Sequence, residues 1–420
     1  MKRQLISAVA FLLLTSLVGC SDLGRTAPEE QPGDPPLMGP VRPLTAAERA
    51  IVTSENAFGF RLFASLNRTV PGRNLFLCPL SVSMALGMTM NGAAGTTKDA
   101  MISTLGFAGM AQEDINRSYA SLSALLTGLD PVVRVQIANS IWYRPTLHVE
   151  DAFKQVNMTY FSAEVNSINF SDPSAAVTIN SWVDRNTNGK ITQVITPPIP
   201  DDIVMYLINA VYFKGSWKYR YDQKDTKADM FTHADGSKTP CSMMSQTDTV
   251  PYFSQNGVQG IDLPYGNAGF SMTVILPPPG VDIDGFVSGL TQEEWDSWMG
   301  KLGKKEVTIY MPKFKLNGQM SLRTVLAGMG MGIAFSDQAD FTGIDKRGSL
   351  AISDVLHFTF VQVDEEGTEA AGVTVVSVRA TMVGPAGPAV MRLDRPFIYA
   401  IRENQSGTVL FIGKLAFPSW

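Results

Sequence analysis

Residues 363–388 read VDEEGTEAAGVTVVSVRATMVGPAGP. Between residues 368 and 378 the side chains alternate in character, as they do on the two faces of a β-strand. The charged residues Glu369 and Arg379 both fall on the odd positions. The even positions hold only small or apolar side chains: Thr368, Ala370, Gly372, Thr374, Val376 and Val378. The stretch therefore predicts a strand that can bury one face and leave the other in water.

A proline- and glycine-rich segment, residues 383–388, follows this alternating stretch directly. Proline cannot donate a hydrogen bond to a strand ladder, so the segment cannot continue a sheet and is predicted to form an exposed loop. The alternation by itself is equally consistent with a plain strand followed by a turn.

The rest of the chain predicts a single α+β domain over residues 45–420. Apolar residues at helical spacing indicate helices around residues 57–66, after Pro79 and over Ala175–Ile195. Period-two patterns and apolar runs predict strands at Asp130–Trp142, Val204–Phe213, Gly260–Pro264, Ser271–Leu276, Val307–Met311, Phe358–Val363, Phe397–Arg402 and Val409–Ala416. Helices mainly in the first half and largely antiparallel strands in the second are typical of the α+β class.

Composition excludes several classes of protein. The chain has 420 residues, of which 45% are hydrophobic, and this excludes wholesale disorder. A formal net charge of −5 gives no basic footprint for nucleic acid. Three cysteines in so long a chain exclude a disulfide scaffold. The sequence contains no HExxH or CxxC pattern of the kind that indicates a zinc site. We therefore expect no metal, no cofactor and no nucleic-acid partner.

The motifs of common enzymes are absent as well. A nucleophilic serine needs a base, usually histidine, but no Gly-x-Ser-x-Gly elbow occurs and the three histidines stand far apart in sequence. His357 lies between apolar neighbours, which favours a role in the core. The glycine-rich run at residues 328–332 lacks the spacing of a dinucleotide site, and no phosphate-binding loop is present. The sequence thus predicts that the protein is not an enzyme.

Residues 1–19 have the form of a signal peptide. Lys2 and Arg3 precede an apolar run that is too short to span a bilayer. The run ends in Leu-Val-Gly-Cys20, which resembles the bacterial lipoprotein box and implies that Cys20 carries the lipid; an ordinary signal peptide that contains a cysteine is the alternative. The proline-rich residues 20–44 predict an extended tether. We therefore expect a domain outside the cytoplasm, lipid-anchored in the bacterial cell envelope at the outer membrane or cell surface, or extracellular.

Several motifs resemble those of one family, the serpins. The segment from Glu365 to Ala371, EEGTEAA, is similar to the hinge of the serpin reactive-centre loop. Six further matches follow the family's order along the chain: Asn74–Ser81, Asn209–Trp217, Leu263-Pro264-Tyr265, Pro312-Lys313-Phe314, Ala339-Asp340-Phe341, and the closing strands with Arg395-Pro396-Phe397 and Gly413-Lys414. Each match is weak alone, but together they identify the chain as a serpin-like protein.

The resemblance implies a fold of three β-sheets and eight or nine helices with an exposed reactive-centre loop. It also implies a suicide inhibitor of serine-type endopeptidases. A protease attacks the loop and forms an acyl-enzyme, and the cut loop then inserts as a new strand in the central sheet. The alternation described above suits such insertion, because the inward face must enter a packed interior without stranding a charge.

The resemblance also assigns roles to particular residues. The hinge comprises Glu365, Glu366, Gly367, Thr368, Glu369, Ala370, Ala371 and Gly372. A polar shutter that governs opening of the sheet is implied at Cys78, Ser81, Asn209 and His357, with Asn209 and His357 as its central pair. Cys78 departs from the family, where serine is usual, and this predicts one weaker hydrogen bond. Trp217 corresponds to the breach tryptophan at the top of the sheet; a plain buried aromatic is the compatible alternative.

The family's usual span from Glu365 places the attacked bond at Thr381-Met382. Thr381 or Ala380 in the recognition pocket of the protease would favour elastase- or subtilisin-like enzymes, and Met382 would favour chymotrypsin-like ones. Arg379 would suit trypsin-like enzymes but requires a short insertion.

Three other functions stay open at this point. The protein could be a non-inhibitory serpin that acts as a binding or chaperone-like module, although the small hinge residues argue against this. It could inhibit papain-like cysteine proteases. A membrane-tethered hydrolase is disfavoured by the missing triad. The expected partners are a target serine protease and, through Cys20, a membrane, with the protein itself a monomer.

Overall fold

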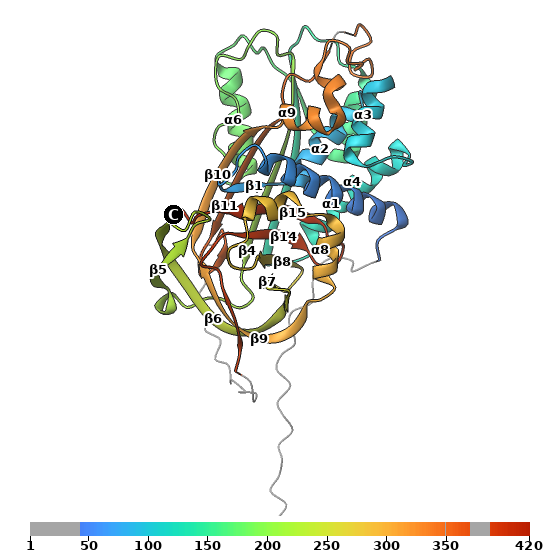
Figure 1. Ribbon diagram of the computed structural model, residues 1–420. Coiled ribbons are helices and arrows are strands. Elements are labelled where there is room, and N and C mark those ends of the chain that lie inside the picture. The colour runs from blue at the N-terminus through green and yellow to red at the C-terminus, as the bar shows by residue number, and fades with distance from the viewer. Residues whose placement is uncertain (1–42, 349, 370–386) are drawn as a thin grey trace, which may run out of the picture. The chain divides into compact units, whose positions relative to one another are not determined.

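Most of the helices come from the first half of the chain. The computed structural model describes residues 43–348, 350–369 and 387–420 (Figure 1). Within those ranges the α-helices are α1 (Ala46–Asn67), α2 (Pro79–Met90), α3 (Gly95–Leu105), α4 (Gln112–Gly128), α5 (Asp151–Phe161), α6 (Ser174–Asn186), α7 (Ile283–Ser288), α8 (Gln292–Met299) and α9 (Arg323–Leu326). Thr45 and Glu48 start α1 through a capping box, in which each side chain bonds to the other's backbone N–H. Pro79 opens α2 at a position where its missing N–H costs nothing.

A six-stranded sheet forms the centre of the domain. Its order is β10-β11-β12-β4-β2-β3, with β10 at Phe314–Ser321, β11 at Leu356–Val363, β12 at Gly367–Thr368, β4 at Met205–Ser216, β2 at Val133–Tyr143 and β3 at Glu164–Ser167. All neighbours are antiparallel except β2 and β3. Figure 1 shows α6 on one side of this sheet and α2 on the other. The sheet is therefore covered on both faces.

The remaining strands form a nine-stranded sheet. Its main path is β1 (Leu75–Leu77), β15 (Val409–Leu415), β14 (Phe397–Glu403), β8 (Phe270–Leu276), β7 (Val258–Tyr265), β6 (Lys238–Gln255), β9 (Gly303–Pro312) and β13 (Ala389–Arg392), and β5 (Lys227–Thr232) pairs with β6. The family resemblance implied three sheets, whereas hydrogen bonding joins two of them here. The joint is β6, which is 18 residues long and pairs in turn with β5, β9 and β7.

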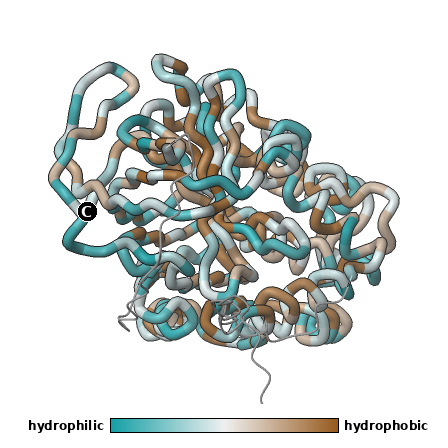
Figure 2. The backbone as a smooth tube through the Cα atoms, turned by 90° about the horizontal axis from the view of Figure 1, so that it is seen from below, coloured by the Kyte–Doolittle hydropathy of each residue, from teal (hydrophilic) through white to brown (hydrophobic). Residues whose placement is uncertain are grey.

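Two apolar clusters hold these layers together. The larger one runs from α1 and α2 through the nine-stranded sheet. The smaller one packs α6, through Ile179 and Trp182, against Trp142 of β2 and Ala210 of β4. In Figure 2 the hydrophobic segments run through the middle of the trace and hydrophilic ones lie around them. Among the described residues no helix has the length and apolar character needed to cross a membrane.

The α+β architecture is confirmed, but some boundaries differ from those predicted. The helix expected over Ala175–Ile195 ends at Asn186, because Asn188 and Gly189 adopt left-handed backbone conformations with φ near 50° and 77°. The sequence patterns missed the strands β1, β3, β5, β6, β10 and β13 and the helices α3, α4, α5, α7, α8 and α9. Many of these elements are half-exposed, so their apolar patterns are short.

Candidate functional site

The hinge enters the six-stranded sheet at one end. Gly367 and Thr368 form β12, which pairs with Gly215 and Ser216 of β4 on one side and, at Thr368, with Val363 of β11 on the other. A Cβ atom on Gly367 would lie 2.1 Å from the carbonyl oxygen of Gly215, so only glycine fits this close approach. Thr368 is 3% exposed. We call this position the hinge seat.

The side chains of the hinge alternate as the sequence predicts. The Thr368 hydroxyl points into the interior and shares a hydrogen bond with the hydroxyl of Tyr265. Glu369 lies on the opposite face, where the Tyr212 hydroxyl donates to its carboxylate at 2.8 Å and the Lys190 Nζ lies 3.3 Å from it. The small side chain therefore packs against Tyr265, and the charged one is buried on the opposite face beside Tyr212 and Lys190.

Trp217 holds the turn that precedes the hinge seat. Its indole N–H donates to the Asp364 carbonyl at 2.9 Å, and its backbone N–H donates to the Glu366 carbonyl at 2.8 Å. The indole is buried and stacks on the ring of Tyr265, with 4.5 Å between centroids. The structure thus places the predicted breach tryptophan in contact with the hinge.

Glu365 anchors the start of the hinge. Lys313 Nζ lies 2.9 Å from its carboxylate, and the Thr226 hydroxyl donates to the other oxygen at 2.8 Å. Burial would raise the pKa of Glu365, but the hydrogen bonds from Lys313, its own backbone and Thr226 outweigh burial and hold the pKa below its ordinary value. The ring of Trp420 covers the same lysine, 4.5 Å from Nζ.

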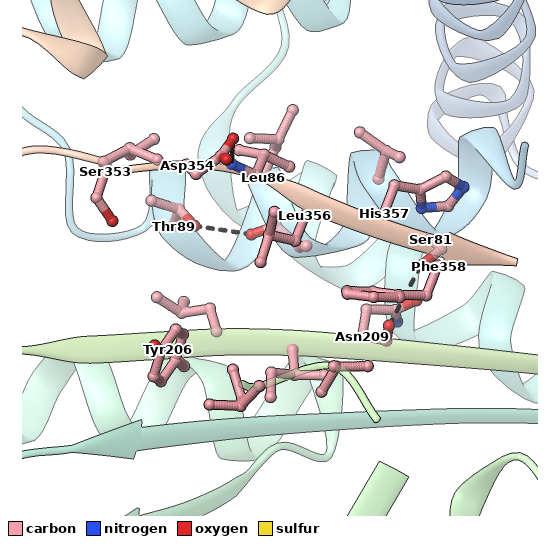
Figure 3. A pocket seen from close by; sticks show the side chains of 18 of the residues that line it. Ser81, Leu86, Thr89, Tyr206, Asn209, Ser353, Asp354, Leu356, His357 and Phe358 are labelled. Atoms are coloured by element: carbon pink, nitrogen blue, oxygen red, sulfur yellow. Dashed lines mark hydrogen bonds between the residues drawn. The ribbon is translucent and has the colours of Figure 1, made fainter. Parts of the chain in front are cut away.

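Below the hinge seat the sheet has an open strand position. In the described part of the chain, no strand pairs with residues 205–214 of β4 on the side that faces β11, and none pairs with residues 356–361 of β11 on the side that faces β4. A cavity of about 440 Å³ lies between the two strands and extends to α2 and to the segment after α6. Figure 3 shows Leu356 and Phe358 on β11 pointing toward β4 across this space. We call it the slot.

The four predicted shutter residues all line the slot, but Asn209 and His357, the implied central pair, form their hydrogen bonds with other residues. His357 and Asn209 share no hydrogen bond within the described structure. The His357 Nε2 accepts from the Cys78 backbone N–H at 3.0 Å, and Asn209 donates to Asn139 at 2.7 Å. The Ser81 hydroxyl donates to the Asn209 carbonyl at 3.4 Å (Figure 3).

Burial determines the protonation state of this group. It lowers the pKa of His357 to about 4, so the imidazole is neutral and can accept the bond from Cys78. Burial also raises the pKa of the Cys78 thiol far above its ordinary value. The family's serine is thus replaced by an inert thiol, and the strand–helix link runs through the backbone instead.

Some predicted site residues lie outside the described residues. These are Cys20, the hinge residues Ala370, Ala371 and Gly372, and the candidate reactive-bond residues Arg379, Ala380, Thr381 and Met382. The predicted signal peptide of residues 1–19 and nearly all of the predicted tether, residues 20–44, also fall outside. Their roles stay predictions.

The family follows from a comparison over most of the chain. The model of the family Serpin (serine protease inhibitor) matches residues 53–418. The chain belongs to the serpin family. This serpin is 31% identical to Iripin-2 of Ixodes ricinus over 88% of its own length and 94% of that protein. It is 33% identical to intracellular coagulation inhibitor 2 of Tachypleus tridentatus over 86% and 90%, respectively.

Solved structures agree with this assignment. The chain is 30% identical to the thermophilic serpin tengpin, and its fold matches the native-state crystal structure of tengpin with a TM-score of 0.80. The match covers 92% of this chain and 97% of tengpin. Human thyroxine-binding globulin, in a crystal structure with its ligand, is 26% identical to this chain with a TM-score of 0.81. That match covers 89% of this chain and 100% of the globulin chain. The serpin fold is therefore confirmed, and serpins are in general protease inhibitors and not enzymes.

Sequence reasoning missed several partners of the hinge. Lys313 and Tyr265 stood inside quoted family motifs, so a closer look at those motifs could have identified them. Lys190 and Tyr212 gave no such signal, because their proximity to Glu369 arises only when the sheet and the segment after α6 come together.

Proposed function

We propose that this serpin is a suicide inhibitor of serine endopeptidases. One observation carries the proposal: Gly367 and Thr368 already occupy the first positions of a strand whose remaining length, the slot, is open. The alternating residues that follow in the sequence, Ala370 to Val378, have the pattern required to fill it. A seated hinge beside an unfilled strand position supports insertion more directly than it supports a static binding role.

The proposed reaction begins with the loop as substrate. The protease serine attacks a carbonyl between Arg379 and Met382, the peptide bond breaks, and the amine of the next residue leaves with a proton. The acyl-enzyme ester then stays attached to the end of the segment that enters the slot. Because Glu365 and Thr368 fix the start of that segment, insertion must proceed from the hinge seat toward Leu356. The attached protease is thereby carried along the sheet before water cleaves the ester.

Judged by the side chains of residues 380–382, elastase- and subtilisin-like enzymes are the first candidates for the target protease, and chymotrypsin-like enzymes are the second. The purified full-length protein would be mixed with each protease and analysed on denaturing gels after boiling. We expect a covalent complex that contains both proteins. A protease whose active serine has been blocked beforehand is the matched control and should form none.

The other outcomes discriminate among the remaining functions. Clean cleavage with no complex would overturn the proposal and favour a non-inhibitory role, such as the ligand binding that the name of thyroxine-binding globulin indicates for that protein. A complex with papain but with no serine protease would replace serine with cysteine proteases as the target class.

We also propose that Cys20 carries the lipid that anchors this serpin to the bacterial envelope. The proposal rests on the sequence, since residues 1–42 lie outside the described structure. Cells that express the protein with radiolabelled palmitate should incorporate label into it, and Cys20→Ala should lose the label. Equal labelling of the two forms, or labelling of neither, would contradict the anchor.

A further inference from the structure

Glu369 is the last hinge residue that the structure describes. The backbone there is left-handed, with φ near 52°, a conformation that is uncommon for a residue other than glycine. Its N–H still donates to the Gln362 carbonyl of β11 at 2.9 Å. The residue is only 8% exposed, although it is acidic and stands where the loop begins. A buried carboxylate and an unusual backbone angle persist together only when the surroundings hold them.

Two strands and the segment after α6 supply those surroundings. Tyr212 of β4 donates its hydroxyl to Glu369, and Lys190 supplies the opposite charge. The Lys190 ammonium also lies 5.1 Å from the centre of the Phe360 ring on β11. Lys190 follows the end of α6, which packs against β2 and β4. We call Lys190, Tyr212, Phe360 and Glu369 the exit cluster.

The lysine itself stands on a fixed turn. Its backbone N–H donates to the Thr187 carbonyl at 3.1 Å, which closes the turn at the end of α6. In the same turn Asn188 donates to the Gln136 side chain of β2 at 2.6 Å. Lys190 is therefore held relative to the sheet independently of the hinge, so it can restrain Glu369 and does not simply follow it.

We propose that Lys190 is a positioning residue that keeps the hinge seated, and that it thereby sets the balance between a seated and a released loop. The inference rests on the proposed inhibitory function. Seating moves the Glu369 carboxylate out of water, and this burial raises its pKa. The ion pair with Lys190 and the bond from Tyr212 offset that cost. Without the Lys190 cation, the cost of burying the Glu369 carboxylate is no longer offset. The population of the released hinge, in which the carboxylate lies in water, then increases.

The balance has opposite effects on the two stages of inhibition. A released hinge gives the loop more freedom to enter a protease active site, which speeds the first encounter. After cleavage, however, Glu369 must return to the exit cluster for insertion to proceed. Loss of the Lys190 charge should therefore raise the association rate and also raise the number of inhibitor molecules consumed for each protease trapped.

The test uses two variants that each remove one charge. Lys190→Met keeps an apolar chain beside Phe360, and Glu369→Gln keeps an acceptor for Tyr212. Lys154→Met is the matched control, because Lys154 is comparably exposed and forms an ion pair with Asp151 far along the chain from the hinge. The first measurement is hydrogen exchange at the Glu369 amide in the free protein. We expect exchange to be faster by about three- to ten-fold in Lys190→Met, as a half-buried ion pair allows. Exchange should stay close to that of the parent in Glu369→Gln, which buries no charge, and in Lys154→Met.

The second measurement is the kinetics of inhibition, where Lys190→Met should show faster association and a higher stoichiometry. The double variant should lie closer to the parent than Lys190→Met does, since without the Glu369 carboxylate no cation is needed at this position. Unchanged exchange at Glu369 in Lys190→Met, or an equally large effect in the double variant, would overturn the role of Lys190. Because the exchange measurement needs no protease, a failure of the inhibitory function would show up separately, as the absence of any complex.

Discussion

A single cut between residues 379 and 382 is expected to raise the melting temperature of this serpin by roughly 10–25 °C, given the entropy of unfolding of a domain of this size. The cut frees the segment after Glu369 to enter the slot, where it would pair with β4 and β11 along edges that are now unpaired. Each new backbone hydrogen bond contributes about 0.5–1.5 kcal/mol, and each buried valine about 1.5–3 kcal/mol. The insertion should therefore stabilise the protein by an amount on the order of 10–20 kcal/mol.

Scanning calorimetry of the intact and the cut protein would measure this shift. Intact protein incubated with the blocked protease is the control for handling. Melting of the cut form at or below the temperature of the intact form would mean that the slot stays empty after cleavage. In that case the inhibitory mechanism would lose its source of free energy, whatever the loop sequence.

Thr368→Arg is expected to convert the inhibitor into a substrate. Thr368 is the second residue of the hinge seat, and its side chain is enclosed between β4 and β11 against Tyr265. An arginine at this position would have to bury its charge at the first step of insertion. We expect the stoichiometry of inhibition to rise at least about ten-fold, which corresponds to ~1.4 kcal/mol in the competition between trapping and release.

Titration of a fixed amount of protease with the variant would give that stoichiometry, and denaturing gels would show cleaved inhibitor in place of complex. Thr368→Ser keeps the small hydroxyl side chain and should trap the protease as the parent does. If Thr368→Arg trapped the protease with the parent's efficiency, insertion through the hinge seat would be excluded. The cut form of this variant should also fail to gain the thermal stability expected for the parent.

Local sequence patterns predicted much of the fold. Pro79 correctly marks the start of α2, and the apolar run near Phe358 correctly predicts β11. The long strand β6 was missed because the polar residues Gln246 and Asp248 interrupt the apolar face that carries Met244 and Val250. Its partners β9, β5 and β7, which lie elsewhere in the chain, define it as a strand and join two expected sheets into one.

The candidate site was also predicted only in part from the sequence. The family motifs identified Trp217 and the hinge, and both lie together in the structure. They also named Asn209 and His357 as the central pair of the shutter. In the structure both line the slot, where His357 accepts from the backbone of Cys78 and Asn209 donates to Asn139.

The sequence by itself determined the serpin family, the α+β class and the alternation that separates Thr368 from Glu369, because each depends on the order of residues along a short stretch. Only the tertiary structure decided that the hinge is already seated, that a cavity continues below it, and that Lys190 meets Glu369. Those features depend on segments far apart in the chain that come within a few ångströms of each other. Their contacts follow from how the sheet and helices pack and leave no signature in the local order of residues.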